Sequence, residues 1–122
     1  LRYFMSLPNA TTLIAEVDGI IGGFLVVNIH GAGSRATLVT LDVKDIYRHA
    51  GIGSELLTRS EDLLAKGGTS RYALQVDTVN SVAFKFYRRH GFRVIRTLRN
   101  YYPNGADAYL MEKHVADGTG PT

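Results

Sequence analysis

Two glycines separated by a single residue, Gly51 and Gly53, follow Arg48 in the segment YRHAGIGSELL. A β-rich stretch precedes this segment, and apolar residues at helical spacing follow it. Glycines at such a junction remove Cβ atoms, so that a ligand can approach the backbone N–H groups that begin a helix. Those groups and the helix dipole favour an anion. The pattern Arg-x-x-Gly-x-Gly over residues 48–54 therefore indicates either an anion site or a glycine-rich turn without a ligand.

The segment departs from two other phosphate-binding patterns. Leu56 stands where the dinucleotide fingerprint G-x-G-x-x-G requires its third glycine. The Lys-Ser/Thr pair of a P-loop is also missing from the segment. The motif alone does not decide between a ligand site and a plain turn.

The elements that must position this motif follow from periodicity and turn residues. Asp18-Gly19 between two β-rich runs predicts a hairpin, and Gly67-Gly68 and Gly91 predict helix ends. The expected strands cover residues 12–17, 20–29, 37–43, 71–78, 92–98 and 107–113, and the expected helices cover residues 52–66 and 80–90. The first three strands should be antiparallel neighbours in a mixed sheet with helices packed on it, an α/β (α+β) fold.

The predicted helices carry apolar residues along one face each. In the first helix the stripe contains Ile52, Leu56, Leu57, Leu63 and Leu64. The second presents Ala83, Phe86, Tyr87 and His90 on one face, with Asn80 or Ser81 as its cap. We interpret residues 1–9 as the end of a helix, residues 1–115 as one domain and residues 116–122 as a flexible tail.

Composition excludes several kinds of chemistry. The chain has 122 residues and is 45% hydrophobic, enough for one domain with a real core. The absence of cysteine excludes disulfides, thiolate metal sites and a cysteine nucleophile. The four histidines lack zinc-site spacing, so we expect no metal. No apolar run reaches the roughly 18–20 residues of a membrane span, and we expect a cytoplasmic protein.

The net charge of +3 is unevenly distributed. Residues 85–99 hold six basic side chains and no acidic one: Lys85, Arg88, Arg89, Arg93, Arg96 and Arg99. This run is either a solvated basic face or a surface for a polyanion, meaning a nucleic acid or a phosphorylated cofactor. Aromatic residues are not interleaved as in single-strand binders, so nucleic acid is the less favoured partner.

The second half of the chain resembles the GNAT superfamily of acyl-CoA-dependent N-acyltransferases. The resemblance rests on the strand TLVTLDV, the loop YRHAGIGSELL, the strand YALQVDTVN and the helix NSVAFKFYRRHGF, in the order and spacing of that family's acetyl-CoA core. The pattern N-x-x-A-x-x-x-Y-x-x-x-G-F over residues 80–92 is its most specific part. The segment NYYPNGADAYLMEK further resembles the protein N-terminal acetyltransferases, including the ribosomal-protein alanine group.

This resemblance implies a GNAT-type mixed, mostly antiparallel sheet with flanking helices, its N-terminal elements shortened. It also implies acetyl-CoA as co-substrate, with Tyr87 as the general acid that protonates the departing thiolate. The implied cofactor-binding residues are Leu41, Asp42, Val43, Arg48, His49, Ala50, Gly51, Ile52, Gly53, Ser54 and Asn80. For Asn80 and Tyr87, a helix N-cap and a core aromatic are the plain structural alternatives. The implied substrate-binding residues are Tyr101, Tyr102 and Gln75.

The residue at the position of the family's general base differs in this chain. Related bacterial enzymes carry glutamate where this chain has Gln75, and an amide cannot accept a proton as a base. Asp42, Asp77 or a water chain remain as alternatives. A weak base suits an α-amino group, which is about one-fifth neutral near pH 7.2, better than a lysine amine, which is about one part in a thousand neutral.

Three functions remain open on the sequence. The first is acetyl transfer by direct attack of a protein or peptide N-terminal amine. The second transfers acetyl to a small amine such as a polyamine or an aminoglycoside, and the third is a non-catalytic acyl-CoA-binding module. Shortened N-terminal elements would expose a sheet edge or face, which either a partner chain in a homodimer or a longer protein would cover.

Overall fold

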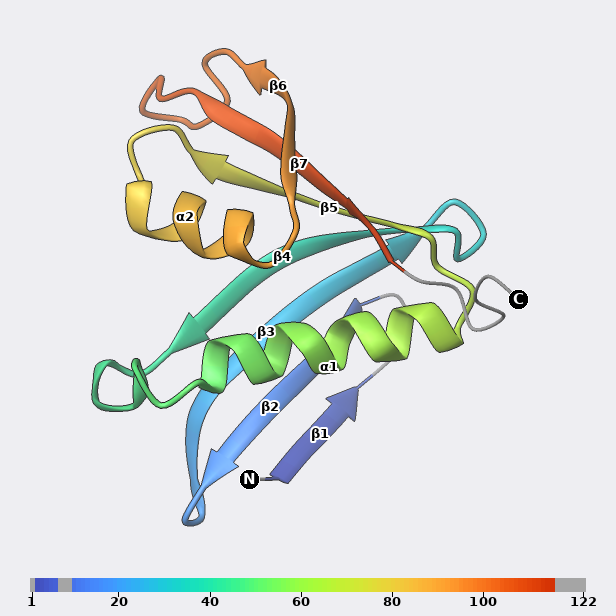
Figure 1. Ribbon diagram of the computed structural model, residues 1–122, viewed down its shortest axis with the longest axis vertical. Coiled ribbons are helices and arrows are strands. Elements are labelled where there is room, and N and C mark those ends of the chain that lie inside the picture. Colours follow the sequence, from blue (N-terminus) through green and yellow to red (C-terminus); the bar gives the residue numbers. More distant parts are fainter. Residues whose placement is uncertain (1, 7–9, 116–122) are drawn as a thin grey trace.

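The computed structural model describes residues 2–6 and 10–115. Seven strands form one sheet in the order β1-β2-β3-β4-β5-β7-β6, accompanied by two α-helices (Figure 1). The strands are β1 (Arg2–Ser6), β2 (Ala10–Val17), β3 (Ile20–His30), β4 (Arg35–Val43), β5 (Arg71–Asp77), β6 (Arg93–Leu98) and β7 (Ala108–His114). The helices are α1 (Ile52–Lys66) and α2 (Ser81–Arg89), with a short 3₁₀ helix (Asp45–Tyr47) before α1.

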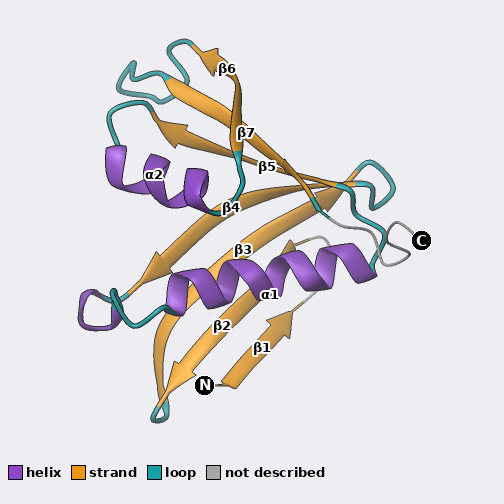
Figure 2. Ribbon diagram, in the orientation of Figure 1, coloured by secondary structure: helices purple, strands orange, loops and turns teal. Residues whose placement is uncertain are grey.

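The sheet is mixed and mostly antiparallel, as the sequence predicts. The pair β4–β5 is parallel, while β1–β2, β2–β3, β3–β4, β5–β7 and β6–β7 are antiparallel (Figure 2). Asp18 and Gly19 both have positive φ, 52° and 80°, which suits the tight two-residue turn of the β2–β3 hairpin. The predicted hairpin and the antiparallel pairing of the first three predicted strands, now β2, β3 and β4, are therefore confirmed.

The core lies between the sheet and α1, and α2 contributes to it. Alternate residues of β5 are buried (Tyr72, Leu74 and Val76), so that this face of the strand contacts the core. Tyr87 of α2 joins the same cluster. Helix α1 begins at the residue that the apolar stripe predicts, and the α1 carboxyl end carries Gly67 and Gly68 as expected.

One member of the predicted stripe lies outside the core. Leu63 is 39% exposed, whereas Ser60 is buried between Leu56 and Leu64 on the inner face of α1. The Ser60 hydroxyl donates to the Leu57 carbonyl and also shares a hydrogen bond with Tyr72. Because both of these hydrogen bonds are satisfied inside the core, a serine can occupy a position where an apolar residue is expected.

The interpretation of residues 1–9 as a helix end is wrong for residues 2–6, which form β1. This strand pairs antiparallel with β2, Arg2 opposite Glu16 and Ser6 opposite Thr12. Tyr3 and Phe4 favour a strand, and the otherwise open edge of β2 supplies the hydrogen-bonding partners. Residues 1, 7–9 and the predicted tail over residues 116–122 lie outside the described residues.

Candidate active site

Strands β4 and β5 pair over a short length and then diverge. In the described chain the parallel register joins residues 35–37 to residues 71–73 and extends no further. The β3–β4 register shifts between Val26 and Val27, which leaves Val39 as an extra residue on β4. Such a bulge bends a strand. The rest of β4 separates from β5 in the ribbon, and its second edge lacks a strand partner (Figure 1).

The residues predicted to line the cofactor lie on this diverging part of β4. Leu41 and Val43 are half-buried against the core, while Asp42 is exposed and accepts a hydrogen bond from Thr40 Oγ1 at 2.9 Å. On the opposite edge these residues pair with β3. A hollow of about 230 Å³ lies at this end of the two strands, lined by residues 21–24 and 42–44. Backbone groups on the open edge of β4 are available to an extended ligand.

The glycine motif forms the predicted junction between β4 and α1. Gly51 is the N-cap of α1 with a φ of +80°, a conformation that glycine adopts without strain. The N–H groups of residues 51–54 belong to the first helical turn and have no partner within the helix. An added Cβ on Gly53 would lie 3.5 Å from Phe86 Cζ and 3.7 Å from Val43 Cγ2. The first turn of α1 therefore lies beside both β4 and α2.

The side chains that precede Gly51 are exposed. Arg48 Nε lies 3.2 Å from Asp45 Oδ1 and 3.4 Å from the Val43 carbonyl oxygen, so this arginine folds back onto the end of β4. An exposed ion pair of this kind contributes little to stability. His49 and Ala50 are also exposed, and Ile52 is buried in the core. Residues 48–54 therefore present mainly backbone N–H groups to an anion.

Asn80 is the N-cap of α2. Its Oδ1 accepts a hydrogen bond from the Ala83 N–H at 3.1 Å, which confirms the structural alternative for this residue. A contact between Asn80 and a cofactor stays a prediction, and the cap does not prevent it because the side-chain amide nitrogen is not used by the cap bond.

Tyr87 is buried on the inner face of α2. Its ring makes edge-to-face contacts with Phe86 and Phe92, at centroid distances of 5.3 Å and 5.8 Å. Burial first, and then the negative charge of Asp42, raise the pKa of Tyr87 to about 12. The phenol therefore keeps its proton at neutral pH and lies near enough to the open part of β4 to be affected by the Asp42 carboxylate.

The three predicted substrate-binding residues lie on β5 and in the connection between β6 and β7. Gln75 alternates with the buried residues of β5 and so points to the face opposite the core. Tyr101 and Tyr102, in the β6–β7 connection, contact each other edge to face at 5.0 Å. The pKa of Tyr102 is raised by burial and then by the negative charge of Asp77 at the end of β5. Asp77 in turn accepts a hydrogen bond from the Val79 N–H at 3.0 Å.

Sequence reasoning missed one pair that joins these parts. Ser54 Oγ in α1 and His90 Nε2 at the end of α2 share a hydrogen bond of 2.9 Å, although 36 residues separate them. The three-residue spacing of His90 from Tyr87 places both on one helix face, and this spacing is the only feature of the local sequence that links His90 to the site. The six basic residues of the 85–99 run are all exposed on α2, β6 and the adjoining loops. Their contact with a polyanion stays a prediction.

The described residues contain no group of three or more side chains arranged to hold a metal ion. Neither helix in the described part of the chain is long and apolar enough to cross a membrane.

Comparisons with known proteins point to one family. The acetyltransferase (GNAT) family profile matches residues 1–92. The N-alpha-acetyltransferase of Sulfurisphaera tokodaii is 33% identical over 114 residues, an alignment covering 84% of this chain and 68% of that protein. The spermidine N(1)-acetyltransferase of Thermoplasma acidophilum is 35% identical over 99 residues, covering 81% of this chain and 56% of that protein.

Solved structures have the same fold. The ribosomal-protein-S18-alanine N-acetyltransferase of Escherichia coli superposes with a TM-score of 0.81 at 27% identity, covering 90% of this chain and 72% of that one. The PaiA N-acetyltransferase of Thermoplasma acidophilum, solved in complex with coenzyme A, gives a TM-score of 0.74 at 31% identity. That alignment covers 87% of this chain and 61% of the PaiA chain.

Proposed function

The chain belongs to the acetyltransferase (GNAT) family, and on this premise we propose that it transfers the acetyl group of acetyl-CoA to the α-amino group of a protein or peptide. The observation that carries the proposal is the position of Tyr87. Tyr87, a buried and protonated phenol, belongs to the core cluster against which Leu41 and Val43 of the open-edged part of β4 pack, and the charge of Asp42 acts on its pKa.

The proposed acetyl-CoA site uses backbone groups more than side chains. The N–H groups of residues 51–54 would hold the diphosphate, because an anion at a helix N-terminus gains from both hydrogen bonds and the dipole. The pantetheine arm would pair with Leu41–Val43 as an added strand, since that edge of β4 is open. Asn80 would donate its side-chain N–H to the arm.

The proposed chemistry is a direct transfer. The neutral amine attacks the thioester carbonyl carbon, so that a C–N bond forms and the C–S bond breaks. Tyr87 donates its phenolic proton to the departing sulfur, and the attacking nitrogen loses a proton to solvent or to a carboxylate. A backbone N–H near Val43 would stabilise the developing oxyanion. The absence of cysteine from the chain excludes a cysteine acetyl-enzyme.

An N-terminal amine is the acceptor that the site supports best. Gln75 has no basic group, and an α-amino group near pH 7.2 is about one-fifth neutral without help. Tyr101 and Tyr102 lie at the carboxyl end of β5, where they can contact the backbone of a peptide. Similarity to an N-alpha-acetyltransferase and to the alanine N-acetyltransferase supports the same acceptor. The cytoplasmic location and the homodimer stay predictions from the sequence.

A small amine is the second candidate. Similarity to a spermidine acetyltransferase at 35% identity favours it, and Asp77 beside Tyr102 offers a negative charge to a polyamine. This reaction would use the same donor site and the same acid, so the acceptor alone distinguishes the two candidates.

The test follows thiol release from acetyl-CoA with a panel of acceptors. The panel contains peptides that begin with Ala, Ser or Met, an N-blocked peptide with one free lysine, and spermidine. We expect turnover on one or more of the first three peptides and less than a tenth of that rate on the last two acceptors. Turnover on spermidine alone would exclude the N-terminal acceptor. Binding of coenzyme A with no turnover on any acceptor would indicate a non-catalytic module.

A further inference from the structure

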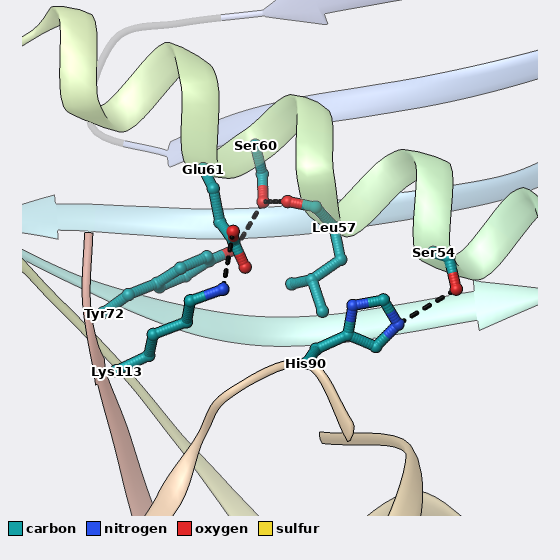
Figure 3. Close-up of polar contacts among 7 residues, drawn as sticks. All are labelled: Ser54, Leu57, Ser60, Glu61, Tyr72, His90 and Lys113. Carbon is teal, nitrogen blue, oxygen red and sulfur yellow. Dashed lines mark hydrogen bonds and ion pairs between the residues drawn. The ribbon is translucent and has the colours of Figure 1, made fainter. Parts of the chain in front are cut away.

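A side-chain hydrogen bond joins the two helices that the proposed site needs. Ser54 Oγ lies in the first turn of α1, and His90 Nε2 lies at the C-cap of α2, 2.9 Å away (Figure 3). Ser54 is the last residue of the proposed diphosphate turn, and His90 follows Tyr87 by three residues. The bond therefore connects the end of the donor site to the helix that carries the acid.

The His90 ring is held from several sides. It packs against the Phe86 ring at a centroid distance of 4.6 Å, and the backbone N–H of His90 donates to the backbone carbonyls of Phe86 and Tyr87. Lys113 of β7 lies just beyond, because an added Cβ on Gly91 would come within 3.3 Å of Lys113 Cε. Lys113 Nζ bonds in turn to Glu61 Oε1 of α1 at 2.9 Å (Figure 3). The imidazole thus has a fixed place against α1.

The Ser54 hydroxyl carries one proton, so it can donate only one hydrogen bond at a time. If His90 Nε2 accepts from Ser54, that proton is used and the hydroxyl turns lone pairs toward an anion. If Nε2 carries a proton and donates to Ser54 Oγ, the serine proton stays free to donate to a phosphate oxygen. An anion bound at the first turn of α1 favours the second arrangement, because a hydrogen bond to a charged group is stronger than one to a neutral group.

We propose that His90 is a positioning residue, which donates to Ser54 Oγ and so directs the Ser54 hydroxyl proton to the diphosphate of the donor. This inference rests on the proposed function and adds one side-chain contact to a turn whose other donors are backbone N–H groups. It predicts a role for His90 in donor binding and none in the acetyl-transfer step.

The test compares donors with and without the diphosphate. Acetyl-CoA and S-acetyl-pantetheine carry the same thioester, and only the first has phosphate groups. We expect Ser54→Ala and His90→Phe each to raise the KM for acetyl-CoA about tenfold, with kcat within about twofold of wild type. The double variant should be no worse than either single variant, because both substitutions remove one interaction. With S-acetyl-pantetheine the differences in kcat/KM should fall below about twofold.

Two further variants separate positioning from packing. His90→Gln keeps an N–H donor near the position of Nε2 and should recover most of the KM, whereas His90→Phe keeps only the ring contact with Phe86. Thr58→Ala removes an exposed hydroxyl one turn later on α1 and should match wild type. If His90→Phe does not fold, Ser54→Ala and His90→Gln still give the comparison between donors.

Two results would overturn the assignment of His90. One is an equal loss with both donors, which would indicate a purely structural role. The other is an unchanged KM for acetyl-CoA in Ser54→Ala and in His90→Phe, while the wild-type enzyme turns over normally. If the folded wild-type chain binds no coenzyme A, the proposed function fails as well, and this outcome is distinct from the first two.

Discussion

Gly23 of β3 lies so close to Asp42 of β4 that an added Cβ would come within 2.9 Å of the Asp42 carbonyl oxygen. The same Cβ would lie 3.3 Å from side-chain atoms of both Ile52 and Leu56 on α1. Gly23 is buried, so a side chain there has no open space to enter. This glycine lets β3, α1 and the part of β4 assigned to the donor come together.

Gly23→Ala should therefore destabilise the fold and reduce activity together. Overpacking of a filled core costs about 1–3 kcal/mol, and relief of the clash requires β4 to move at Asp42. Chemical denaturation and the KM for acetyl-CoA measure the two effects. Gly67→Ala is the matched control, because Gly67 has a φ of −85° and its Cβ would meet atoms at 3.6 Å. A wild-type KM in Gly23→Ala would contradict this role for the glycine.

Tyr87→Phe should lower kcat at least about tenfold while the affinity for coenzyme A stays within about twofold, as expected for loss of a general acid alone. Because the pKa of Tyr87 is raised to about 12, its deprotonation should not lower the wild-type rate below about pH 11. A pH–rate profile and calorimetry with coenzyme A check both statements. An unchanged kcat in the variant would remove Tyr87 from the mechanism.

Gln75→Glu should raise turnover on an N-terminal amine at pH 7 more than at pH 9. The α-amino group has a pKa of about 7.7–8.0, so at pH 9 most of it is already neutral and a base adds little. Gln75→Met, similar in length but without a charge, is the control. Equal activity of the glutamate variant and wild type at both pH values would show that position 75 does not limit deprotonation.

Lys113→Met should destabilise the fold by about 1–3 kcal/mol. The Lys113–Glu61 pair is largely buried, and Glu61 Oε2 has no hydrogen-bond partner in the described structure. Removal of the lysine leaves a buried carboxylate without its cation. The double variant Glu61→Gln, Lys113→Met should recover part of the loss in thermal denaturation. A single variant as stable as wild type would mean that the pair is dispensable.

The stability of the fold should fall as pH drops below about 6.5, in part through His90. Burial lowers the pKa of His90, and the positive charges of Lys113 and Arg89 also lower it, against an opposing effect of Glu61. The unfolded chain then takes up the proton at a higher pH than the folded chain does. The contribution of neutral His90 to the free energy of unfolding is complete above the pKa that this histidine has in the unfolded chain. It is lost as pH falls through the lower pKa that His90 has in the folded chain.

The difference in the free energy of unfolding between wild type and His90→Gln, measured from pH 7.5 to pH 5, isolates this histidine from the other titrating groups. The wild type should lose more stability than the variant over this range. Parallel pH curves for the two proteins would contradict the shift.

Local patterns predicted much of this molecule. The glycine motif, the cap at Asn80 and the stripe of α1 each depend on residues within one or two turns of each other, and the structure contains the elements that they predict. Contacts between residues far apart in the sequence could not be predicted from such local patterns. The bulge at Val39, which turns β4 away from β5, follows from cross-strand register, and the Ser54–His90 bond joins residues 36 positions apart. β1 was missed because a strand at a sheet edge depends on its partner more than on its own residues.

Calorimetric titration of the folded chain with coenzyme A, alongside pantetheine, measures whether residues 51–54 bind the diphosphate. We expect measurable heat and saturable binding for coenzyme A, with affinity at least about tenfold weaker for pantetheine, because the N–H groups of residues 51–54 act on the diphosphate. A folded chain that gives no heat with coenzyme A, or that binds both compounds equally well, would contradict this expectation.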